Sequence, residues 1–384
     1  MRIFICNGTL ITPTRTLTGH RLVIEDGKIS ALVPDGEAEP QPLDRIIDAA
    51  GMYVTAGLID MHIHGCAGAD TMDASPKTLP AMSRFLAAHG VTAFLPTTIS
   101  SSAAALTSAM AAYRATRHTC EGARPLGLHL EGPYLNPLYT GAQPVSWLRK
   151  PDPAEYEPWL AGGDVRVITL APELDGAQEL IRVAAQFGIR TAAGHSDATY
   201  ERALQAFDNG LSIAVHTFNG MAPLHHRRPG LVGAALSDDR IYTELIADGV
   251  HLHPAVLRLA VKAKGVERTL LMTDAMRATG LPDGEYDLGG QNIQVKGGVA
   301  LTSTGNLAGS TLTLDAAVRN AMQFCGLSFA EAVRMATLTP ARALGIETQK
   351  GQLLPGADAD VVLWDENFSI QRTLVAGQTV FMRK

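Results

Sequence analysis

The middle of the chain alternates between short apolar runs typical of buried strands and longer alanine- or leucine-rich runs typical of helices. Eight strand-like runs follow one another at Leu58–His64, Val91–Thr97, Pro125–Glu131, Val165–Leu170, Arg190–His195, Ser212–His216, Tyr242–Ala247 and Thr269–Asp274. Helical runs follow most of them, at Leu79–His89, Ala103–Arg117, Ala177–Phe187, Ala198–Asn209, Pro254–Lys264 and Leu312–Phe324. This alternation predicts an α/β fold of the (β/α)8 TIM-barrel type.

An open doubly wound sheet would give the same alternation. Such a sheet binds its ligand in one crevice, and its dinucleotide-binding members carry Gly-x-Gly-x-x-Gly after a strand. No motif of this kind follows any strand-like run here, and polar residues end many of the runs. We therefore expect the barrel.

Both ends of the chain are rich in strand-like runs. The N-terminal runs are Arg2–Cys6, Arg21–Glu25, Lys28–Leu32 and Arg45–Asp48, and the C-terminal runs are Asp360–Trp364, Ser369–Val375 and Thr379–Arg383. Asp26-Gly27 and Gly377-Gln378 are turn signals between neighbouring runs. We expect residues 1–54 and 350–384 to form one small β-sandwich domain, and residues 55–349 to form the barrel of a metal-dependent hydrolase. A further strand-like excursion at Glu285–Leu301 is expected to form a lid or wall above the barrel mouth.

Composition restricts the partners of the chain. The net charge is −6, and the one basic tract is His225-His-Arg-Arg228, which disfavours nucleic-acid binding. The four cysteines lie far apart without a Cys-x-x-Cys pair, which indicates reduced thiols rather than disulfides. No apolar run reaches membrane-spanning length, and the chain starts directly on a strand-like run without a signal-peptide pattern. These features predict a cytoplasmic protein with neither a membrane nor a nucleic acid as partner.

Residue types that bind metals stand at the ends of several strand-like runs. Glu131 ends a buried run, and a buried carboxylate requires a cation, a proton or several donors. His62 and His64 share one face of a strand and can reach the same ion. Taken singly, a lone histidine is more often a core residue, and an aspartate after a strand is often a helix N-cap. The carboxyl ends of barrel strands meet where barrel active sites are built. We therefore expect six residues to converge on a divalent metal: His62, His64, Glu131, His195, His216 and Asp274.

Longer motifs extend this interpretation to a family. Ala56-Gly-Leu-Ile-Asp-Met-His-Ile-His-Gly65 and the run Gly351–Asp365 resemble the amidohydrolase superfamily. Six further motifs are similar to those of its N-acetylglucosamine-6-phosphate deacetylases: His129-Leu-Glu-Gly-Pro133, Thr169-Leu-Ala-Pro-Glu173, Ala193-Gly-His-Ser196, His216-Thr-Phe-Asn-Gly-Met221, Ile246-Ala-Asp-Gly-Val-His251 and Thr273-Asp-Ala-Met276. The resemblance spans essentially the whole chain.

The resemblance assigns a role to each matching position. It implies that Asp274 is the catalytic acid and base. It also implies that Glu131, His195 and His216 are metal ligands, joined by His62 and His64 in relatives that bind two ions. It implies substrate contacts at Asn219, Gly220, Arg227, His251, Ala142, Gln143, Leu307, Ala308 and Gly309. Arg227 is the expected phosphate contact and reaches into the neighbouring subunit of a homodimer. The expected cofactor is one or two divalent ions, zinc foremost, with iron, cobalt or manganese as alternatives.

One position departs from the family pattern. The family usually has a histidine where this chain has Gln143, and that histidine is thought to help polarise the acetyl carbonyl. The Gln143 amide can still donate a hydrogen bond, but it cannot carry a positive charge. This departure bears on the rate of the reaction or on the sugar that is accepted.

Three hypotheses of function follow. The first is metal-dependent hydrolysis of a linear amide, N-acetylglucosamine 6-phosphate, to glucosamine 6-phosphate and acetate in amino-sugar catabolism. Asp274 would take a proton from the metal-activated water and pass it to the departing nitrogen. The second is a sister amidohydrolase acting on another N-acetyl amino sugar, such as N-acetylgalactosamine 6-phosphate, or on an N-acyl amino acid. The third, a non-catalytic assembly protein on the same barrel, is disfavoured because such proteins typically have lost metal ligands, whereas all are present here.

Overall fold

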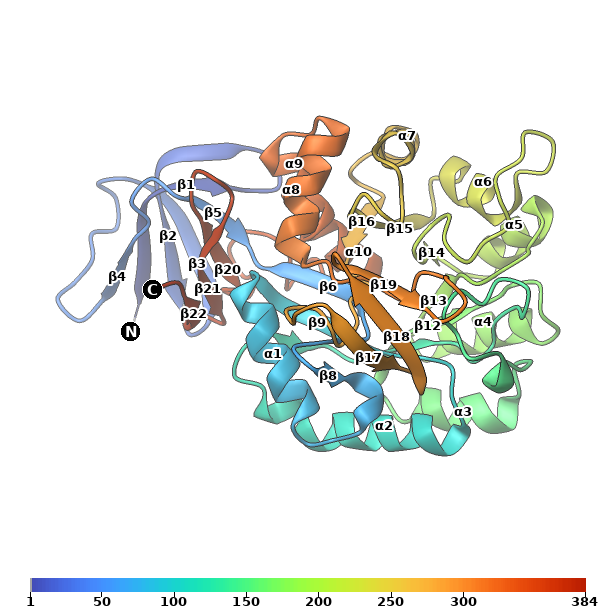
Figure 1. Ribbon diagram of the computed structural model, residues 1–384. Helices are drawn as coiled ribbons and strands as arrows, with labels where there is room; N and C mark the ends of the chain where they lie inside the picture. The colour runs from blue at the N-terminus through green and yellow to red at the C-terminus, as the bar shows by residue number, and fades with distance from the viewer. Residues whose placement is uncertain (1) are drawn as a thin grey trace.

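The computed structural model describes residues 2–384, so that Met1, which the expected terminal domain includes, lies outside the described residues. Eight parallel strands form a barrel in the order β6 (Leu58–Ile63), β9 (Val91–Thr98), β11 (Leu128–Glu131), β12 (Val165–Leu170), β13 (Arg190–Ala193), β14 (Ile213–Ala214), β15 (Tyr242–Ile246) and β16 (Thr269–Met272) (Figure 1). The short β10 (Arg124–Pro125) pairs with β9 beside this ring. The last strand returns to the first, because the Asp274 N–H donates to the His62 carbonyl at 2.9 Å. The predicted barrel is confirmed.

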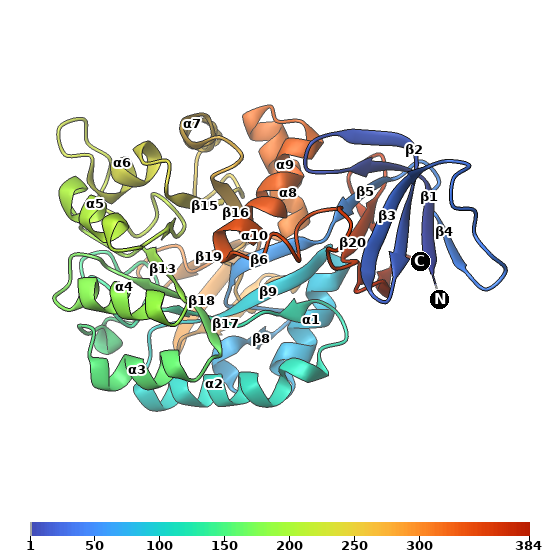
Figure 2. The same ribbon diagram turned by 180° about the vertical axis from the view of Figure 1, so that it is seen from behind.

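Helices surround the barrel strands (Figures 1 and 2). Six of them agree with the predicted helical runs: α1 (Thr78–Ala88), α2 (Ala103–Thr116), α4 (Ala177–Gln186), α5 (Tyr200–Asp208), α7 (Pro254–Lys264) and α8 (Leu314–Cys325). Sequence patterns missed α3 (Pro153–Ala161), α6 (Gly230–Ser237), α9 (Phe329–Met335) and α10 (Leu338–Leu344). Pro158 inside α3 and the glycines that open and interrupt α6 conceal their helical character. Three single 3-10 turns lie at Thr71–Asp73, Arg117–Thr119 and Val145–Trp147.

Apolar side chains close the N-terminal end of the barrel. Ile59 and Leu270 are each the second residue of their strands, and they belong to one buried cluster with Ala341 of α10. The Ile59 N–H donates to the Ala336 carbonyl just before α10 at 2.8 Å. The polar residues therefore stand at the opposite, carboxyl end of the strands, where barrel enzymes carry their sites.

The two ends of the chain build one antiparallel and parallel mixed sheet. Its strands are β1 (Ile3–Ile11), β2 (Thr16–Glu25), β3 (Lys28–Pro34), β4 (Arg45–Asp48), β5 (Tyr53–Ala56), β20 (Val361–Trp364), β21 (Ile370–Val375) and β22 (Gln378–Met382). They follow the order β22-β21-β20-β5-β1-β2-β3, with β4 beside β1, and the pairing of β5 with β20 joins the two ends of the chain. The sheet lies beside the barrel, and both termini lie on it (Figures 1 and 2). The sequence patterns missed β5.

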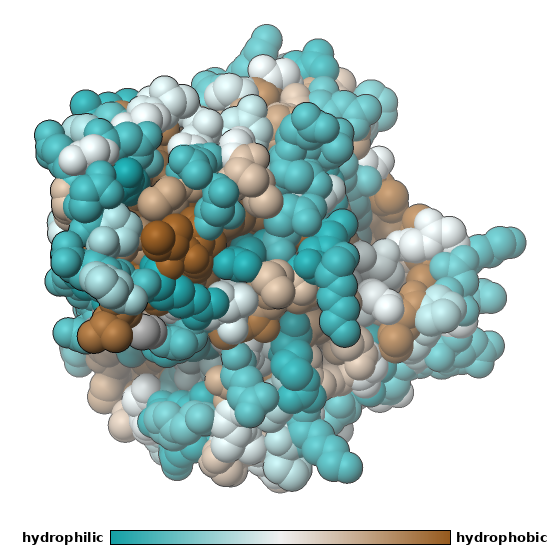
Figure 3. All heavy atoms as spheres, turned by 90° about the vertical axis from the view of Figure 1, so that its left-hand side faces the viewer, coloured by the Kyte–Doolittle hydropathy of each residue, from teal (hydrophilic) through white to brown (hydrophobic). Residues whose placement is uncertain are grey.

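This sheet has a core of its own, which includes Ile5, Leu22 and Leu363. Its outer end is mainly hydrophilic, with small separate hydrophobic patches (Figure 3). We propose that the sheet forms the small domain expected at residues 1–54 and 350–384. No helix within residues 2–384 is both long enough and apolar enough to cross a membrane.

A three-stranded antiparallel sheet, called the flap sheet below, follows the last barrel strand. It consists of β17 (Gly284–Leu288), β18 (Gln291–Lys296) and β19 (Val299–Thr302), where the sequence shows a strand-like excursion. Leu288 and Ile293 pack on Ile99 and Met276 at the barrel mouth, and the sheet covers one side of the barrel in Figure 1. The small hairpin of β7 (Gly65–Cys66) and β8 (Ala69–Asp70) follows the first barrel strand.

Candidate active site

The carboxyl ends of the barrel strands bring together all six residues expected at the metal. His62 lies in β6 and Glu131 ends β11; the others stand one or two residues beyond a strand, at His64, His195, His216 and Asp274. All six residues are buried, Asp274 being the most accessible at 9% exposed. These residues are far apart in sequence but close in space, because the carboxyl ends of the barrel strands meet at the same rim.

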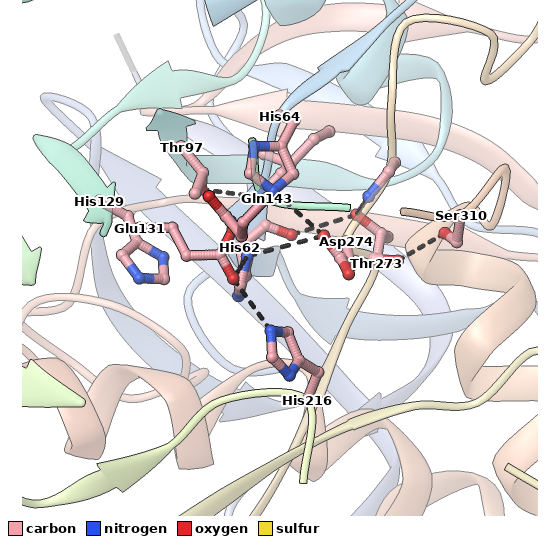
Figure 4. A network of polar contacts seen from close by, with 12 residues as sticks. His62, His64, Thr97, His129, Glu131, Gln143, His216, Thr273, Asp274 and Ser310 are labelled. Carbon is pink, nitrogen blue, oxygen red and sulfur yellow. Dashed lines mark hydrogen bonds and ion pairs between the residues drawn. The ribbon is translucent and has the colours of Figure 1, made fainter. Parts of the chain in front are cut away.

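Glu131 lies at the centre of the group. Its Oε1 is 2.9 Å from His216 Nε2 and 3.2 Å from His195 Nε2, and its Oε2 is 3.2 Å from His64 Nε2. His62 Nε2 lies 3.5 Å from the same Oε1. In Figure 4 the Glu131 side chain extends between His216 on one side and His62 and His64 on the other.

Asp274 approaches the same group from the opposite side (Figure 4). Its Oδ1 is 3.3 Å from His64 Nε2 and 3.6 Å from His62 Nε2. Its backbone is in the left-handed region at φ 50°, as are those of His195 at 48° and His216 at 27°. Such conformations are costly for residues other than glycine, and they gather at sites where geometry serves function.

The donor set fits a divalent cation. Nδ1 of His195 lies 2.8 Å from the Tyr139 carbonyl, and Nδ1 of His216 lies 3.1 Å from the Asn219 carbonyl. Since a carbonyl only accepts, each Nδ1 carries a proton, and each neutral ring then presents a lone pair at Nε2. Those lone pairs face the Glu131 carboxylate, which also only accepts. A cation between these acceptors resolves the conflict.

Two groups of three residues meet this requirement, and they share one carboxylate. His62, His64 and Glu131 form one group, and Glu131, His195 and His216 form the other; within each, the ligand atoms lie within 4.8 Å of one another. His62 Nε2 is buried without a hydrogen-bond partner among the described residues. The chain therefore has the ligands for a divalent metal centre, as histidine and carboxylate ligands at this spacing suit such ions.

The charges of the centre reinforce this fit. Burial favours the neutral form of Glu131, yet the neighbouring rings of His62, His195 and His216 hold the pKa of its carboxyl well below the usual range. Burial also opposes ionisation of Asp274, but His64 and His62 lower its pKa to about 2. Burial alone would lower the pKa of His64, and the two carboxylates raise it to about 9. Both carboxylates are thus ionised and attract a cation strongly.

A second layer of polar residues supports the first, and the sequence analysis missed it. Oε2 of the buried Glu244 lies 3.1 Å from His62 Nδ1, and the Thr273 hydroxyl donates to Asp60 at 2.7 Å. His129 lies 2.7 Å from the Thr169 hydroxyl, and burial lowers the pKa of its ring far below the usual value, which keeps it neutral. Charged residues inside otherwise apolar strand runs were the available signal for Asp60 and Glu244.

A cavity of about 330 Å³ is lined by five of the six candidate metal-site residues, namely His64, Glu131, His195, His216 and Asp274. It is lined by seven of the expected substrate-binding residues: Ala142, Gln143, Asn219, Gly220, His251, Leu307 and Gly309. Ala308 instead points into the apolar core under the flap sheet and is fully buried. Arg227 does not line this cavity; its exposed side chain lines a separate hollow with Tyr139 and Tyr200.

Gln143 has a defined place in the cavity wall. Its Nε2 donates to Glu131 Oε2 at 2.6 Å, and its Oε1 accepts from the Ser100 N–H at 2.9 Å. The neighbouring Ala142 carbonyl accepts from Gln291 of β18 at 2.6 Å, which ties this loop to the flap sheet. The glutamine therefore binds the central metal ligand rather than standing free in the cavity.

Known proteins resemble this chain along nearly its whole length. N-acetylglucosamine-6-phosphate deacetylase of Vibrio furnissii is 43% identical over 365 residues, covering 94% of this chain and 90% of the relative. N-acetylgalactosamine-6-phosphate deacetylase of Escherichia coli O157:H7 is 42% identical over 375 residues, covering 96% and 97%. The crystal structure of N-acetylglucosamine-6-phosphate deacetylase from Pasteurella multocida matches with a TM-score of 0.94 at 33% identity, covering all of both chains. Residues 53–380 match the amidohydrolase family, and with these relatives beside that match, the chain belongs to the amidohydrolase family.

Proposed function

We propose that this chain is a metal-dependent hydrolase that removes the acetyl group from N-acetylglucosamine 6-phosphate, giving glucosamine 6-phosphate and acetate. The observation that carries the proposal is the shared Glu131, which joins two groups of metal ligands beside Asp274 at the floor of the cavity. The cavity has the volume of a small-molecule site. Relatives of near-full length carry this activity in their names.

The residues of the site divide the reaction between them. A divalent ion held by Glu131, His195 and His216 would lower the pKa of a bound water and polarise the acetyl carbonyl. Asp274 accepts one proton from the attacking water at its carboxylate. It then donates that proton to the sugar nitrogen as the carbon–nitrogen bond breaks, so that acetate and a free amine leave.

Substrate contacts extend from this centre to the rim. His251 lines the cavity, and its Nδ1 is held 2.6 Å from Asp248 Oδ2, which fixes the orientation of the ring. Arg227 lies on an exposed loop away from the cavity of its own chain. We therefore propose a homodimer in which Arg227 of one chain binds the sugar phosphate in the cavity of the other, since guanidinium groups match phosphate oxygens well.

Zinc is the proposed metal, with two ions per chain. Imidazole and carboxylate ligands suit zinc, and they also suit iron, cobalt and manganese. The completeness of the His62, His64 and Glu131 group argues for a second ion. Retention of every ligand also argues against a non-catalytic assembly role.

The galacto isomer, N-acetylgalactosamine 6-phosphate, is the second candidate substrate. It is favoured by the Escherichia coli relative, which is as similar in sequence as the N-acetylglucosamine-6-phosphate deacetylases, and by Gln143 in the cavity wall.

Acetate release by the zinc-loaded protein from both phosphorylated sugars, and from unphosphorylated N-acetylglucosamine, tests the proposal. We expect turnover to be fastest on N-acetylglucosamine 6-phosphate and to be abolished by Asp274→Asn. Asp239→Asn is the control, because Asp239 is exposed and does not line the cavity. Preference for the galacto isomer would establish the second candidate, and no release from either sugar by folded, metal-loaded protein would refute both.

A further inference from the structure

Glu244 is a buried carboxylate with a single side-chain partner. It lies in the middle of β15, its side chain has no exposed surface, and it does not line the cavity. Its Oε2 is 3.1 Å from His62 Nδ1, and its Oε1 has no hydrogen-bond partner among residues 2–384. A buried carboxylate with so little compensation is costly, so its presence in an apolar strand requires a reason.

We propose that Glu244 is a positioning residue that creates the second cation site by holding His62. The proposal rests on the metal-dependent function proposed above, and it concerns the ion bound by His62, His64 and Glu131. Glu244 does not touch the ion. It acts through the imidazole, by fixing which nitrogen carries the proton and where the other nitrogen points.

The hydrogen bond determines the tautomer of His62. The Glu244 oxygen that faces the ring accepts, so the proton between the two groups is on His62 Nδ1. When the ring serves as a metal ligand it is neutral, and its lone pair is then at Nε2, which lies 3.5 Å from Glu131 Oε1 and 3.6 Å from Asp274 Oδ1. This Nε2 is buried and has no hydrogen-bond partner in the described part of the chain. It is therefore free to bind a cation placed among these oxygens.

The two halves of the metal centre are supported differently. His195 and His216 are held at Nδ1 by neutral backbone carbonyls. In the other half, Nδ1 of His64 has no hydrogen-bond partner among the described residues, so the orientation of that half depends on the bond between His62 and Glu244. Loss of Glu244 should consequently weaken binding of the second ion and leave binding of the first ion unchanged.

The side chain is not needed to hold its strand. The backbone of Glu244 pairs with Leu270 in the barrel, and its carbonyl accepts from the Thr217 N–H at 2.8 Å. An apolar residue of similar volume at such a position usually supports a fold as well as a buried ion pair does. The carboxylate therefore serves His62 rather than the barrel wall.

Metal titration of the full-length protein tests the proposal without an activity assay. Metal-free wild type, Glu244→Gln and His62→Gln are titrated with zinc by calorimetry and with cobalt by absorption, and bound ions are counted after gel filtration. We expect two ions in wild type. In Glu244→Gln, we expect the second ion to bind roughly 10- to 100-fold more weakly, the usual effect of losing a residue that orients a metal ligand, and the first ion to bind within about threefold of wild type. Thr243→Val, an equally buried neighbour on β15, is the matched control and should bind both ions normally.

The double variant His62→Gln/Glu244→Gln separates positioning from a general loss of structure. If Glu244 acts through His62, the double variant binds metal no more weakly than His62→Gln alone. If Glu244→Gln does not fold, Glu244→Asp, which keeps the charge but withdraws it from His62, should still weaken the second ion selectively.

Three results would overturn the proposal: wild type that binds one ion, Glu244→Gln that binds the second ion normally, or variants that weaken both ions equally. Failure of the proposed function has a different signature, namely normal binding of two ions by wild type without acetate release from either sugar.

Discussion

Lys350 offers a sharp test of how burial sets the strength of an ion pair in the terminal domain. Its Nζ lies 2.7 Å from Asp358 Oδ2 and 2.7 Å from Asp360 Oδ2. Lys28 also binds Asp358, at 2.6 Å, but the Lys28 side chain is 50% exposed whereas that of Lys350 is 9% exposed. The two lysines therefore contact the same carboxylate, but the contact of Lys350 is shielded from water and that of Lys28 is exposed to it.

We expect Lys350→Met to lower the free energy of unfolding by about 3 kcal/mol. Removal of one partner from a buried ion pair costs roughly 3–5 kcal/mol, because the other charge stays buried without compensation. The lower end applies here, because the Asp360 Oδ1 still accepts from the Ala376 N–H at 2.9 Å and Asp358 keeps Lys28. Lys28→Met should cost less than about 1 kcal/mol, as exposed pairs do.

Urea denaturation of both variants, followed by fluorescence and circular dichroism at one metal concentration, measures this difference. The reasoning also requires Asp360→Asn in the Lys350→Met background to restore part of the stability, because it removes the buried charge that lost its partner. Equal losses in the two lysine variants, or no recovery in the double variant, would refute the argument from burial.

Two further predictions concern the site, and a third concerns the buried Asp315 of α8. Gln143→His should leave both ions bound and change turnover, since it replaces the donor to Glu131 and supplies a ring that can carry charge; loss of metal in that variant, measured by ion counting, would contradict the geometry of this loop. Gly220→Ala should weaken binding of the first ion, the one held by Glu131, His195 and His216. A Cβ at this position would lie 2.8 Å from His195 Nδ1, on a backbone with φ of 58°. Calorimetry should show normal binding of the second ion. Asp315 makes a pH-dependent contribution to stability: burial opposes its ionisation, but His89 and Arg319 lower its pKa to about 2. The unfolded value is higher, so its stabilisation of about 2 kcal/mol is present above pH 4 and is lost as pH falls toward 2; the gap in unfolding free energy between wild type and Asp315→Asn should close over that range, and a constant gap would contradict the assignment.

The barrel was predictable because strand and helix periods leave a strong trace in the sequence. The eight strand-like runs coincide with β6, β9, β11, β12, β13, β14, β15 and β16. Elements whose residues oppose their own conformation were not predictable, such as α3 with its internal Pro158. Packing against the barrel stabilises such a helix, and local propensity does not report that contribution.

The cluster of candidate metal ligands was predictable for a related reason. Once the strands are known, the barrel fixes where their last residues meet, and Glu131, His195 and His216 need no further information to be placed together. Strand order could not predict that Arg227 lies outside the cavity of its own chain, because the order of the strands does not fix the path of a loop between elements.

Residues that act on other residues are the harder case. Glu244 has no motif around it, and its role depends on one distance, 3.1 Å to a histidine that is 182 positions earlier in the chain. A strand pattern indicates only that a charge inside an apolar run needs a partner, and it does not name that partner. Chemistry at strand ends can therefore be inferred from sequence, whereas the orientation of that chemistry depends on long-range contacts that appear only in the folded barrel.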